Sequence, residues 1–348
     1  MTALRVVVDA TAVRLGGGLS YVTRQIGAVA RVRPDIDLRV VAAPWNVDAL
    51  REALPVEVDR AGVRGLVDRV AYEQVVLPRF VRDGAVLHCP GNLVPLPPWR
   101  PPTSLVVQNP NLFGTGRRLP HNRRWRRRLQ AATARRSVRS ADAVIAVSEA
   151  MMAEIRADVP DLGNRGVVVQ SGAPSWPADT EAFARELPPQ GYVLSVANDA
   201  PHKRLDDLVE AWASAFPTSG PGLVLVGHVA PRPHRDGVVY AGPVSDQRVL
   251  RGLVEGALVM VSTSALEAHP HTPAVAGALG CPLILSDIPP HREVAGEHPL
   301  AYVPVGDVGA LAAALRAAAA DPTRRPWAWP ITWDDHAREL VAVWESLV

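Results

Sequence analysis

The 348-residue sequence contains very little cysteine: Cys89 and Cys281 lie far apart, each in an apolar context. This argues against a disulfide-stabilised scaffold, and we expect two buried, reduced thiols that take no part in catalysis. Long apolar runs are also missing, since no stretch of about eighteen apolar residues occurs without interruption. The start, MTALRVVVDA, lacks the apolar region of a secretion signal. We therefore expect a cytoplasmic protein, dissolved or peripheral on the inner face of the membrane.

Charge of one sign is not in excess, because 37 Lys and Arg face 35 Asp and Glu. The net charge of +2 argues neither for nor against a polyanionic partner. Metal-ligand patterns are scarce as well. The one Asp-x-Asp, Asp35 to Asp37, begins a predicted strand instead of following one, and no cysteine or histidine spacing suits zinc. We expect neither a metal nor an organic cofactor.

What the sequence does have is an alternation of short β-branched runs with helical stretches rich in Ala, Leu and Arg. This alternation predicts parallel sheets with crossover helices. Six strands are expected before a Pro-rich linker at 173–189 and six after it, at 5–8, 38–42, 85–88, 104–108, 143–147, 167–170, 192–196, 223–226, 238–240, 259–262, 283–286 and 301–303. The predicted fold class is α/β, with two doubly wound, Rossmann-like domains at 1–175 and 176–330, followed by a helix at 331–348.

One segment, Ser264 to Asp287, combines an acidic loop, a helix of small residues, a Gly-Cys-Pro stop and a buried strand. In an open α/β sheet, such a loop and the helix start after it face the crevice where anionic ligands bind. Glu267 lies in this loop, and Lys203 and Arg204 lie at the start of a helix predicted at 205–215. The alternative for Glu267 is an acid that merely complements a helix dipole. For the two cations it is a solvated position at a helix start.

Seven landmarks then occur in a fixed order along the chain. They are Gly16–Tyr21, Ser140–Glu149, Tyr192–Ala197 with Pro201–Leu205, Gly242–Asp246, Ser264–Asp287, Ile288–Val294 and Ile331–Asp334. Together they resemble the motifs of glycosyltransferase family 4, including its glycine-rich first loop and its sugar-nucleotide signature. The resemblance implies a GT-B architecture, in which an acceptor-side domain and a nucleotide-sugar-binding domain face each other across a cleft. It also implies that the helix at 331–348 crosses back to the N-terminal domain.

The resemblance also implies a role for individual residues. A nucleotide-diphosphate sugar leaves a charged diphosphate, so Lys203 is expected to steady that charge and Glu267 to orient the sugar. Gln108 and Asn109 are expected to contact the acceptor or the sugar. The remaining donor-binding candidates are Gly17, Gly18, Asn198, Arg204, Gly227, His228, Val244, His269, His271, Thr272, Pro273, Ala274 and Val275. The glycines Gly17 and Gly18 let a backbone approach a phosphate or an acceptor, or simply form a tight turn between strand and helix.

Two positions depart from the family pattern. The second glutamate of the signature, which normally holds the donor ribose, is replaced by Val275, which cannot accept a hydrogen bond. The loss is worth roughly 1.5 to 3 kcal/mol, which weakens binding without necessarily ending turnover. Gln108 and Asn109 stand where the family often has a His-Asp pair, and both can still bond a hydroxyl.

An arginine-rich stretch at Arg117–Arg139 holds ten arginines around Trp125 and Leu129. It is suited to an anionic membrane surface or an anionic acceptor, and the alternative is a solvated helix face. No recognised nucleic-acid motif accompanies it, so we expect no nucleic-acid partner.

The sequence as a whole favours a metal-independent glycosyltransferase, and the resemblance implies that it retains the anomeric configuration. It would move a sugar from a nucleotide-diphosphate sugar to a glycan, lipid-linked or small-molecule acceptor. The alternative from another class is a catalytically silent paralogue that binds a sugar nucleotide or acts as a scaffold, as Val275 and Gln108 suggest. A sugar-nucleotide epimerase is a further, less favoured alternative.

Overall fold

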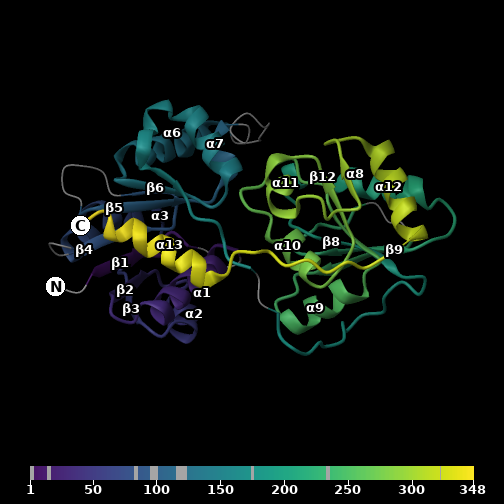
Figure 1. Cartoon of the computed structure of the whole chain (residues 1–348), viewed down its shortest axis with the longest axis horizontal. Helices are drawn as coiled ribbons and strands as arrows, with labels where there is room; N and C mark the ends of the chain where they lie inside the picture. Colours follow the sequence, from purple (N-terminus) through teal and green to yellow (C-terminus); the bar gives the residue numbers. More distant parts are fainter. Residues whose placement is uncertain are drawn as a thin grey trace. The chain divides into compact units, whose positions relative to one another are not determined.

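The computed structural model describes residues 4–13, 17–81, 85–94, 101–114, 124–173, 176–232, 236–321 and 323–348. The chain forms two units. The first contains Met1–Gly172 and Ile331–Val348, and the second contains Ala173–Pro330. The chain therefore passes between the units twice, at 172/173 and at 330/331 (Figure 1).

The first unit is built on a parallel sheet with the order β3-β2-β1-β4-β5-β6-β7 among its described residues. The strands are β1 (Arg5–Asp9), β2 (Asp37–Ala42), β3 (Glu57–Arg60), β4 (Ala85–Cys89), β5 (Thr103–Val107), β6 (Ala143–Ala146) and β7 (Gly166–Val168). Its helices are α1 (Gly17–Val32), α2 (Val47–Ala53), α3 (Leu66–Ala71), the π-helix η1 (Tyr72–Val76), α4 (Leu77–Phe80), α6 (Arg124–Ser140), α7 (Glu149–Asp158) and α13 (Trp333–Glu345), with 3₁₀ turns η2 (Pro110–Leu112) and η3 (Pro160–Arg165).

The second unit has the parallel order β10-β9-β8-β11-β12-β13 in the part described. Its strands are β8 (Tyr192–Val196), β9 (Gly222–Val226), β10 (Val238–Gly242), β11 (Val259–Ser262), β12 (Leu283–Ser286) and β13 (Ala301–Val303). Its helices are α8 (Leu205–Ala215), α9 (Gln247–Gly256), α10 (His271–Ala278), α11 (Pro289–Ala295) and α12 (Val308–Ala320), and η4 (Pro201–Lys203) is a 3₁₀ turn. In both units the strand order reverses beside the first strand, the mark of a doubly wound sheet.

Alternate residues of the second sheet face opposite layers, as strand geometry requires. Val193, Leu223 and Leu225 pack with α8 and α12 in one core cluster. Leu194 and Val224 pack with α9 and α10 in the other. The sheet is thus covered on both faces, so its strands are apolar throughout, which is why they were predicted from sequence.

All twelve predicted strands occur, with ends that differ by at most two residues, but β3 was missed. Its sequence, EVDR, buries only Val58 among its four residues and lies at the edge of the sheet. An edge strand with one buried side chain carries no apolar alternation to detect.

The Pro-rich segment at 173–189 was predicted as a linker between the domains. In the structure it belongs to the second unit, where Trp176, Phe183 and Leu187 pack against the core that includes α9 and α10. The Glu181 amide also donates to the Arg248 carbonyl at 3.3 Å. The prolines prevent helix and strand, but they do not prevent packing.

Helix α13 packs against α1 in the first unit (Figure 1), and a capping box between Thr332 and Asp335 starts it. Its Trp344 is fully buried. The Trp344 indole donates to His88 Nδ1 at 3.3 Å and to the Ser104 hydroxyl at 3.1 Å. A helix near the end of the chain is therefore part of the first unit's core.

A buried hydrogen-bond network supports this docking. Gln25 contacts His88 Nε2 through Oε1 at 3.1 Å and His336 Nε2 through Nε2 at 3.0 Å. His336 Nδ1 donates to the Gln170 carbonyl at 2.8 Å. Because carbonyl oxygens only accept, His336 carries its proton on Nδ1 and His88 on Nε2. Each imidazole then uses its other nitrogen as an acceptor, so the network is satisfied when both are neutral.

Candidate functional site

The site predicted around Lys203 and Glu267 lies where the strand order of the second sheet reverses. Strands β8 and β11 are neighbours there, although two strands separate them in sequence. Lys203 follows β8 and Glu267 follows β11, so both side chains lie at the carboxyl edge of adjacent parallel strands. Ligands of doubly wound sheets bind at this position.

Lys203 and Glu267 form an ion pair, with Nζ and Oε1 2.6 Å apart. Their side chains remain 19% and 16% exposed, so the pair is sheltered and still reachable. Burial alone would raise the pKa of Glu267. The Lys203 ammonium and the Ser264 hydrogen bond outweigh burial and hold that pKa below its usual value. Glu267 is thus an ionised acceptor, and the ammonium has two further N–H groups for a ligand.

Hydrogen bonds fix the two loops to each other. The Ala265 amide donates to the His202 carbonyl at 2.7 Å, and the Thr263 hydroxyl donates to the Lys203 carbonyl at 2.8 Å. Below them, His291 is buried and donates from Nδ1 to the Ser286 carbonyl at 2.8 Å. Burial lowers the pKa of His291, so it stays neutral next to the ion pair. The pair therefore rests on a rigid layer.

Arg204 adopts the left-handed conformation, with φ 50° and ψ 41°, directly before α8. This conformation suits glycine or asparagine and is strained for arginine. The Arg204 guanidinium bonds Asp207 at 2.6 Å and reaches Gly306, where an added Cβ would lie 2.9 Å from its Nη2. The side chain is therefore directed along the loop before α12 and paired with an acid.

Beside this loop is a pocket with an empty volume of about 280 Å³, its open mouth included. It is lined by the carboxyl ends of β11, β12 and β13 and by Asp207 and Asp307. Lys203 and Glu267 do not line it. The strand reversal and the paired loops converge on the ion pair and not on this pocket.

Four other predicted residues lie on loops at the same edge of the second sheet. Gly227 has φ 124°, and an added Cβ would lie 1.9 Å from the Ala197 carbonyl oxygen, so only glycine fits. Asn198 accepts the Ala200 amide at 3.2 Å, and His228 is exposed. Val244 packs against the core instead of extending outward, which leaves its backbone as the contact group.

Helix α10 carries the remaining predictions. It begins at His271, which is exposed, and Thr272 is half-buried, whereas Ala274 is buried. His269 is largely buried, with its ring 4.7 Å from that of His271. Val275 is half-buried, so an aliphatic side chain stands where the resemblance leads one to expect a carboxylate. Pro270 and Pro273 have no amide hydrogen, so neither donates a backbone hydrogen bond at the helix start.

Comparison with known proteins finds a family match in the part of the chain that contains Lys203 and Glu267. No curated protein matches the sequence. Residues 190–321 match the family model described as Glycosyl transferases group 1. Among solved structures, the lipopolysaccharide outer core galactosyltransferase WaaB in its apo form has a TM-score of 0.63 at 14% identity, covering 99% of each chain. Residues 190–321 therefore form a glycosyltransferase domain, and the chain as a whole has the GT-B fold.

Other structures share the fold at similarly low identity. Sucrose-phosphate synthase from Thermosynechococcus elongatus has a TM-score of 0.67 at 17% identity, covering 99% of this glycosyltransferase and 94% of the synthase. The Anabaena protein HepE, solved with UDP and glucose, has a TM-score of 0.60 at 14% identity, covering 99% and 100%. These likenesses extend over both units of the glycosyltransferase and establish its architecture.

The glycosyltransferase has its other predicted residues in the first unit, where Gly17 and Gly18 are exposed at the start of α1. Gly16 lies outside the described residues. Gln108 and Asn109 follow β5, and the backbone amides of both residues donate to Asn92 Oδ1, at 3.0 and 3.2 Å. Asn92 itself has φ 65°. Gln108 and Asn109 are thus held at the carboxyl end of β5 by Asn92, in a left-handed conformation that asparagine tolerates.

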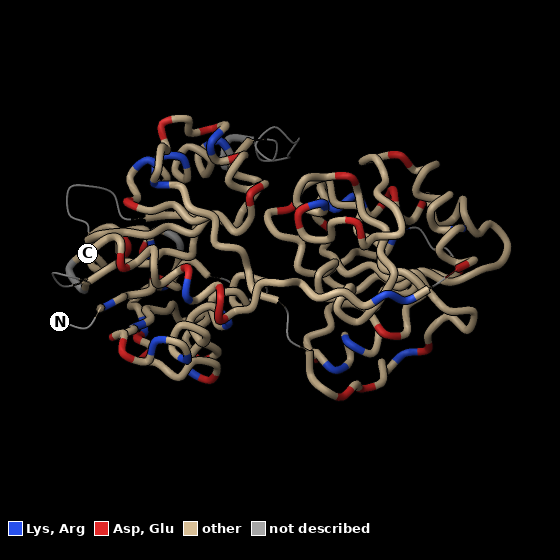
Figure 2. The backbone as a smooth tube through the Cα atoms, in the orientation of Figure 1, with Lys and Arg blue, Asp and Glu red and all other residues tan. Residues whose placement is uncertain are grey.

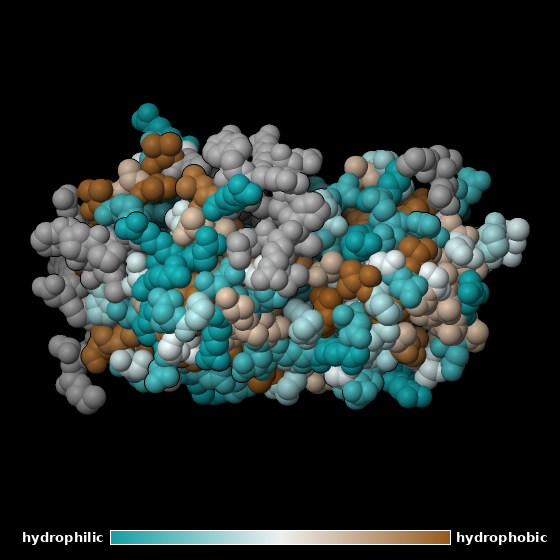
Figure 3. Space-filling model, turned by 90° about the horizontal axis from the view of Figure 1, so that it is seen from above, coloured by the Kyte–Doolittle hydropathy of each residue, from teal (hydrophilic) through white to brown (hydrophobic). Residues whose placement is uncertain are grey.

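The arginine-rich stretch is only partly described in this glycosyltransferase. Residues 117–123 and the side chains of 124–127 lie outside the described part. In α6, Arg128 and Arg136 are exposed, Arg139 pairs with Asp161 at 3.3 Å, and Leu129 is 62% exposed. Basic and acidic residues occur on both units (Figure 2), and hydrophobic residues lie in small groups among hydrophilic ones over the face in Figure 3.

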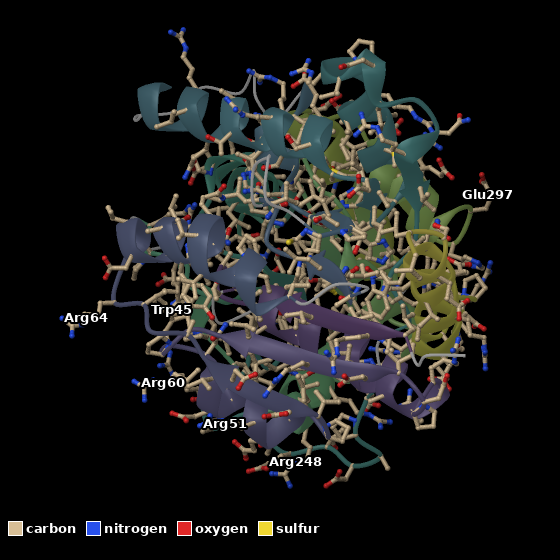
Figure 4. All side chains as sticks on the ribbon, turned by 90° about the vertical axis from the view of Figure 1, so that its left-hand side faces the viewer. Trp45, Arg51, Arg60, Arg64, Arg248 and Glu297 are labelled. Atoms are coloured by element: carbon tan, nitrogen blue, oxygen red, sulfur yellow. The ribbon has the colours of Figure 1, made fainter. Side chains whose placement is uncertain are left out.

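Along the edge seen in Figure 4, Arg60 and Arg64 project outward, as charged residues on a loop and an edge strand do. None of the helices in the described part of the glycosyltransferase has both the length and the apolar character that a membrane span requires. The described residues also contain no group of three His, Cys, Asp or Glu side chains arranged to hold a metal ion.

One cluster in the glycosyltransferase was not predicted. Asp9 ends β1, Glu73 lies in the π-helix η1, and the Thr11 hydroxyl contacts Asp9 Oδ1 at 2.6 Å and Glu73 Oε1 at 3.0 Å. Both acids are buried, and Arg69 lies 3.3 Å from Glu73. A hydroxyl has one proton, so one of the two carboxyls must be protonated for both contacts to be hydrogen bonds. Burial and Asp9 raise the pKa of Glu73 to about 7. In the sequence, the cluster is indicated only by Glu73, an acidic residue in a segment with several valines.

Proposed function

We propose that this glycosyltransferase moves a sugar from a nucleotide-diphosphate sugar to an acceptor hydroxyl with retention of anomeric configuration and without a metal. The observation that carries the proposal is the Lys203–Glu267 pair at the strand reversal of the domain matched by the family model. The bond from the anomeric carbon to the phosphate oxygen breaks, and the acceptor oxygen bonds that carbon from the same face. The acceptor proton passes to the departing diphosphate.

Each residue of the pair has a separate task in this scheme. Besides its bond to Glu267, the Lys203 ammonium has two more N–H groups. These donate to the diphosphate oxygens as negative charge grows on them. Glu267 accepts hydrogen bonds from sugar hydroxyls and so orients the anomeric carbon. The Thr263 and Ala265 hydrogen bonds hold the two loops together, so the pair is already assembled when the donor arrives.

The acceptor is proposed to be a glycan, a lipid-linked saccharide or a small molecule, bound through Gln108, Asn109 and the loop at Gly17 and Gly18. The exposed arginines of α6 would favour an acceptor carried on an anionic membrane surface. This part of the proposal predicts that the protein sediments with vesicles containing phosphatidylglycerol and not with phosphatidylcholine vesicles.

The experiment is a transfer assay with UDP-, GDP- and dTDP-sugars, with and without EDTA, on the wild type, Lys203→Ala and Glu267→Gln. We expect sugar transfer or slow donor hydrolysis that survives EDTA and falls about 10²- to 10³-fold in each variant. Gly309→Ala is the matched control, since its new Cβ meets only Asp307 at 3.5 Å.

The second candidate function, a silent sugar-nucleotide-binding subunit, rests on Val275 and Gln108. It predicts donor binding without turnover across the acceptor panel. Conversion of the free sugar nucleotide without any acceptor would instead indicate an epimerase.

A further inference from the structure

The last turn of α10 is covered by both segments that connect the second unit to the first. From the first connection, the Trp176 indole donates to the Val275 carbonyl at 3.2 Å. The Leu279 amide turns to the Ala276 carbonyl instead, at 3.1 Å. A helix leaves its last four carbonyls without helical partners, and Trp176 satisfies one of them.

The second connection approaches the same turn. The Trp327 amide donates to the Gly277 carbonyl at 3.2 Å. An added Cβ on Gly277 would lie 2.0 Å from Trp327 Nε1, and one on Gly280 would lie 3.0 Å from Pro326. Glycine within a helix costs about 1 kcal/mol relative to alanine, so its presence at 277 is explained by the indole against it.

Aromatic contacts extend this second connection along the helix. The Trp327 ring stacks on His298, with centroids 5.0 Å apart and planes at 4°. Trp329 is largely buried and lies 5.5 Å from the His269 ring, just before the start of α10. The segment 326–329 therefore touches α10 at its end and the loop at its beginning.

We propose that Trp176 and Trp327 are positioning residues, which hold α10 so that His271 and Thr272 meet the donor and which tie donor binding to both connections between the units. The inference rests on the proposed function. An α-helix of eight residues is a rigid rod about 12 Å long, so a displacement at Gly277 is transmitted to His271.

Helix α10 needs such support because it has little of its own. It has eight residues with small side chains, follows Pro270 and contains Pro273 in its first turn, and a helix this short is marginal without packing. Its buried face, which includes Ala274 and Ala276, offers little volume for side-chain interlocking. The two tryptophans supply the packing that the helix lacks, since both are partly buried and pack against the core cluster that includes Ala276.

The test uses the full chain with Trp176→Phe and Gly277→Ala. The first keeps an aromatic ring but loses the indole donor, and the second places a methyl group against the Trp327 indole. Two controls match them. Trp212→Phe removes an indole bond to the Pro221 carbonyl of the same unit at 2.9 Å, and Gly309→Ala adds a methyl to an uncrowded helix. UDP-, GDP- and dTDP-glucose are the probes, read by calorimetry, donor KM and hydrogen exchange of residues 271–278.

We expect the affinity for the bound probe to fall about tenfold in Trp176→Phe and Gly277→Ala, with a matching rise in donor KM and little change in kcat. Exchange across α10 should accelerate in both, and Trp212→Phe should lower stability without changing affinity. Unchanged affinity and exchange in both test variants would overturn the inference.

The experiment distinguishes failure of the proposed function from failure of the positioning role of Trp176 and Trp327. If the wild type binds none of the three probes, the proposed function fails and the exchange data alone judge the positioning role. Faster exchange across α10 in the test variants supports it, and exchange at the wild-type rate rejects it. If Gly277→Ala does not fold, Trp327→Phe replaces it and is held to the same outcomes.

Discussion

At the scale of single residues, the site joins two positions predicted from sequence with several that were not. Lys203 and Glu267 were predicted because each follows a strand, and strand order brings those ends together. Three features could not be predicted from the sequence: the strain at Arg204, the bonds of Gln108 and Asn109 to Asn92, and the Asp9–Thr11–Glu73 cluster. Each depends on backbone angles or on contacts between residues far apart in the sequence. Val275 was recognised as a departure, and the structure shows its carbonyl, not its side chain, engaged.

Arg204 allows a direct test of backbone strain. Glycine at this position should be more stable than alanine by about 1 kcal/mol, because both lose the Asp207 bond but only glycine accepts φ 50° without strain. Urea unfolding of Arg204→Gly and Arg204→Ala checks the difference. Alanine equal to or better than glycine, as in a helix interior, would contradict the assigned conformation.

Glu73 predicts an unusual pH dependence. Its pKa in the folded chain is raised from 4.5 to about 7, so its stabilising contribution is complete below pH 4.5 and is lost as the pH rises through 7. Glu73→Gln keeps a hydrogen-bond donor and removes the titration. The variant should gain stability over the wild type as the pH rises from 4.5 to 8, by up to about 3 kcal/mol. The same difference in unfolding free energy between Glu73→Gln and the wild type at pH 4.5 and at pH 8 would refute this prediction.

At the scale of elements, the apolar strands and the long amphipathic helices follow from the sequence pattern, since burial on both faces leaves a continuous apolar run. The edge strand β3 was missed because it buries one side chain. The π-helix η1 was missed because it buries Glu73, whereas Val75 and Val76 of the same helix are exposed. Val67 in the preceding helix α3 is exposed as well. The inward acid among outward valines opposes the usual pattern.

The network that docks α13 also predicts a pH dependence, of opposite sign. Burial lowers the pKa of His88 to about 3 and of His336 to about 4, against an ordinary value of 6.5. Both must be neutral in the folded chain, so their contribution is present above pH 6.5 and is lost as the pH falls toward 4. At pH 5 each costs about 2 kcal/mol relative to pH 7. His336→Gln should reduce the slope of stability against pH by about one proton in this window, measured by urea unfolding. An unchanged slope would contradict the neutral network.

At the scale of the whole molecule, the two units were predicted from the restart of the strand pattern after the prolines. The return of the chain to the first unit at 331 was expected only from the family resemblance. The structure supplies the physical reason, since α13 buries Trp344, Leu340 and Ala337 completely and completes the core of the first unit.

A chain ending at Pro330 should therefore lose the first unit selectively. Removing α13 uncovers its partners on α1 and forfeits several buried side chains, each worth about 1.5 to 3 kcal/mol. Limited proteolysis should cut within 1–172 and spare 190–321. A control chain with Arg338→Ala, a change at an exposed position of α13, should resist cleavage as the wild type does. Equal protection of both units in the truncated chain would show that α13 is dispensable.

The central claim is that the second unit holds the diphosphate of an activated sugar at Lys203. The most direct measurement is calorimetric titration of the wild type and Lys203→Ala with UDP-, GDP- and dTDP-sugars. We predict saturable binding of at least one donor class by the wild type and an affinity at least tenfold weaker in the variant. Binding of equal strength in both proteins, or no binding of any donor by the wild type, would contradict the account.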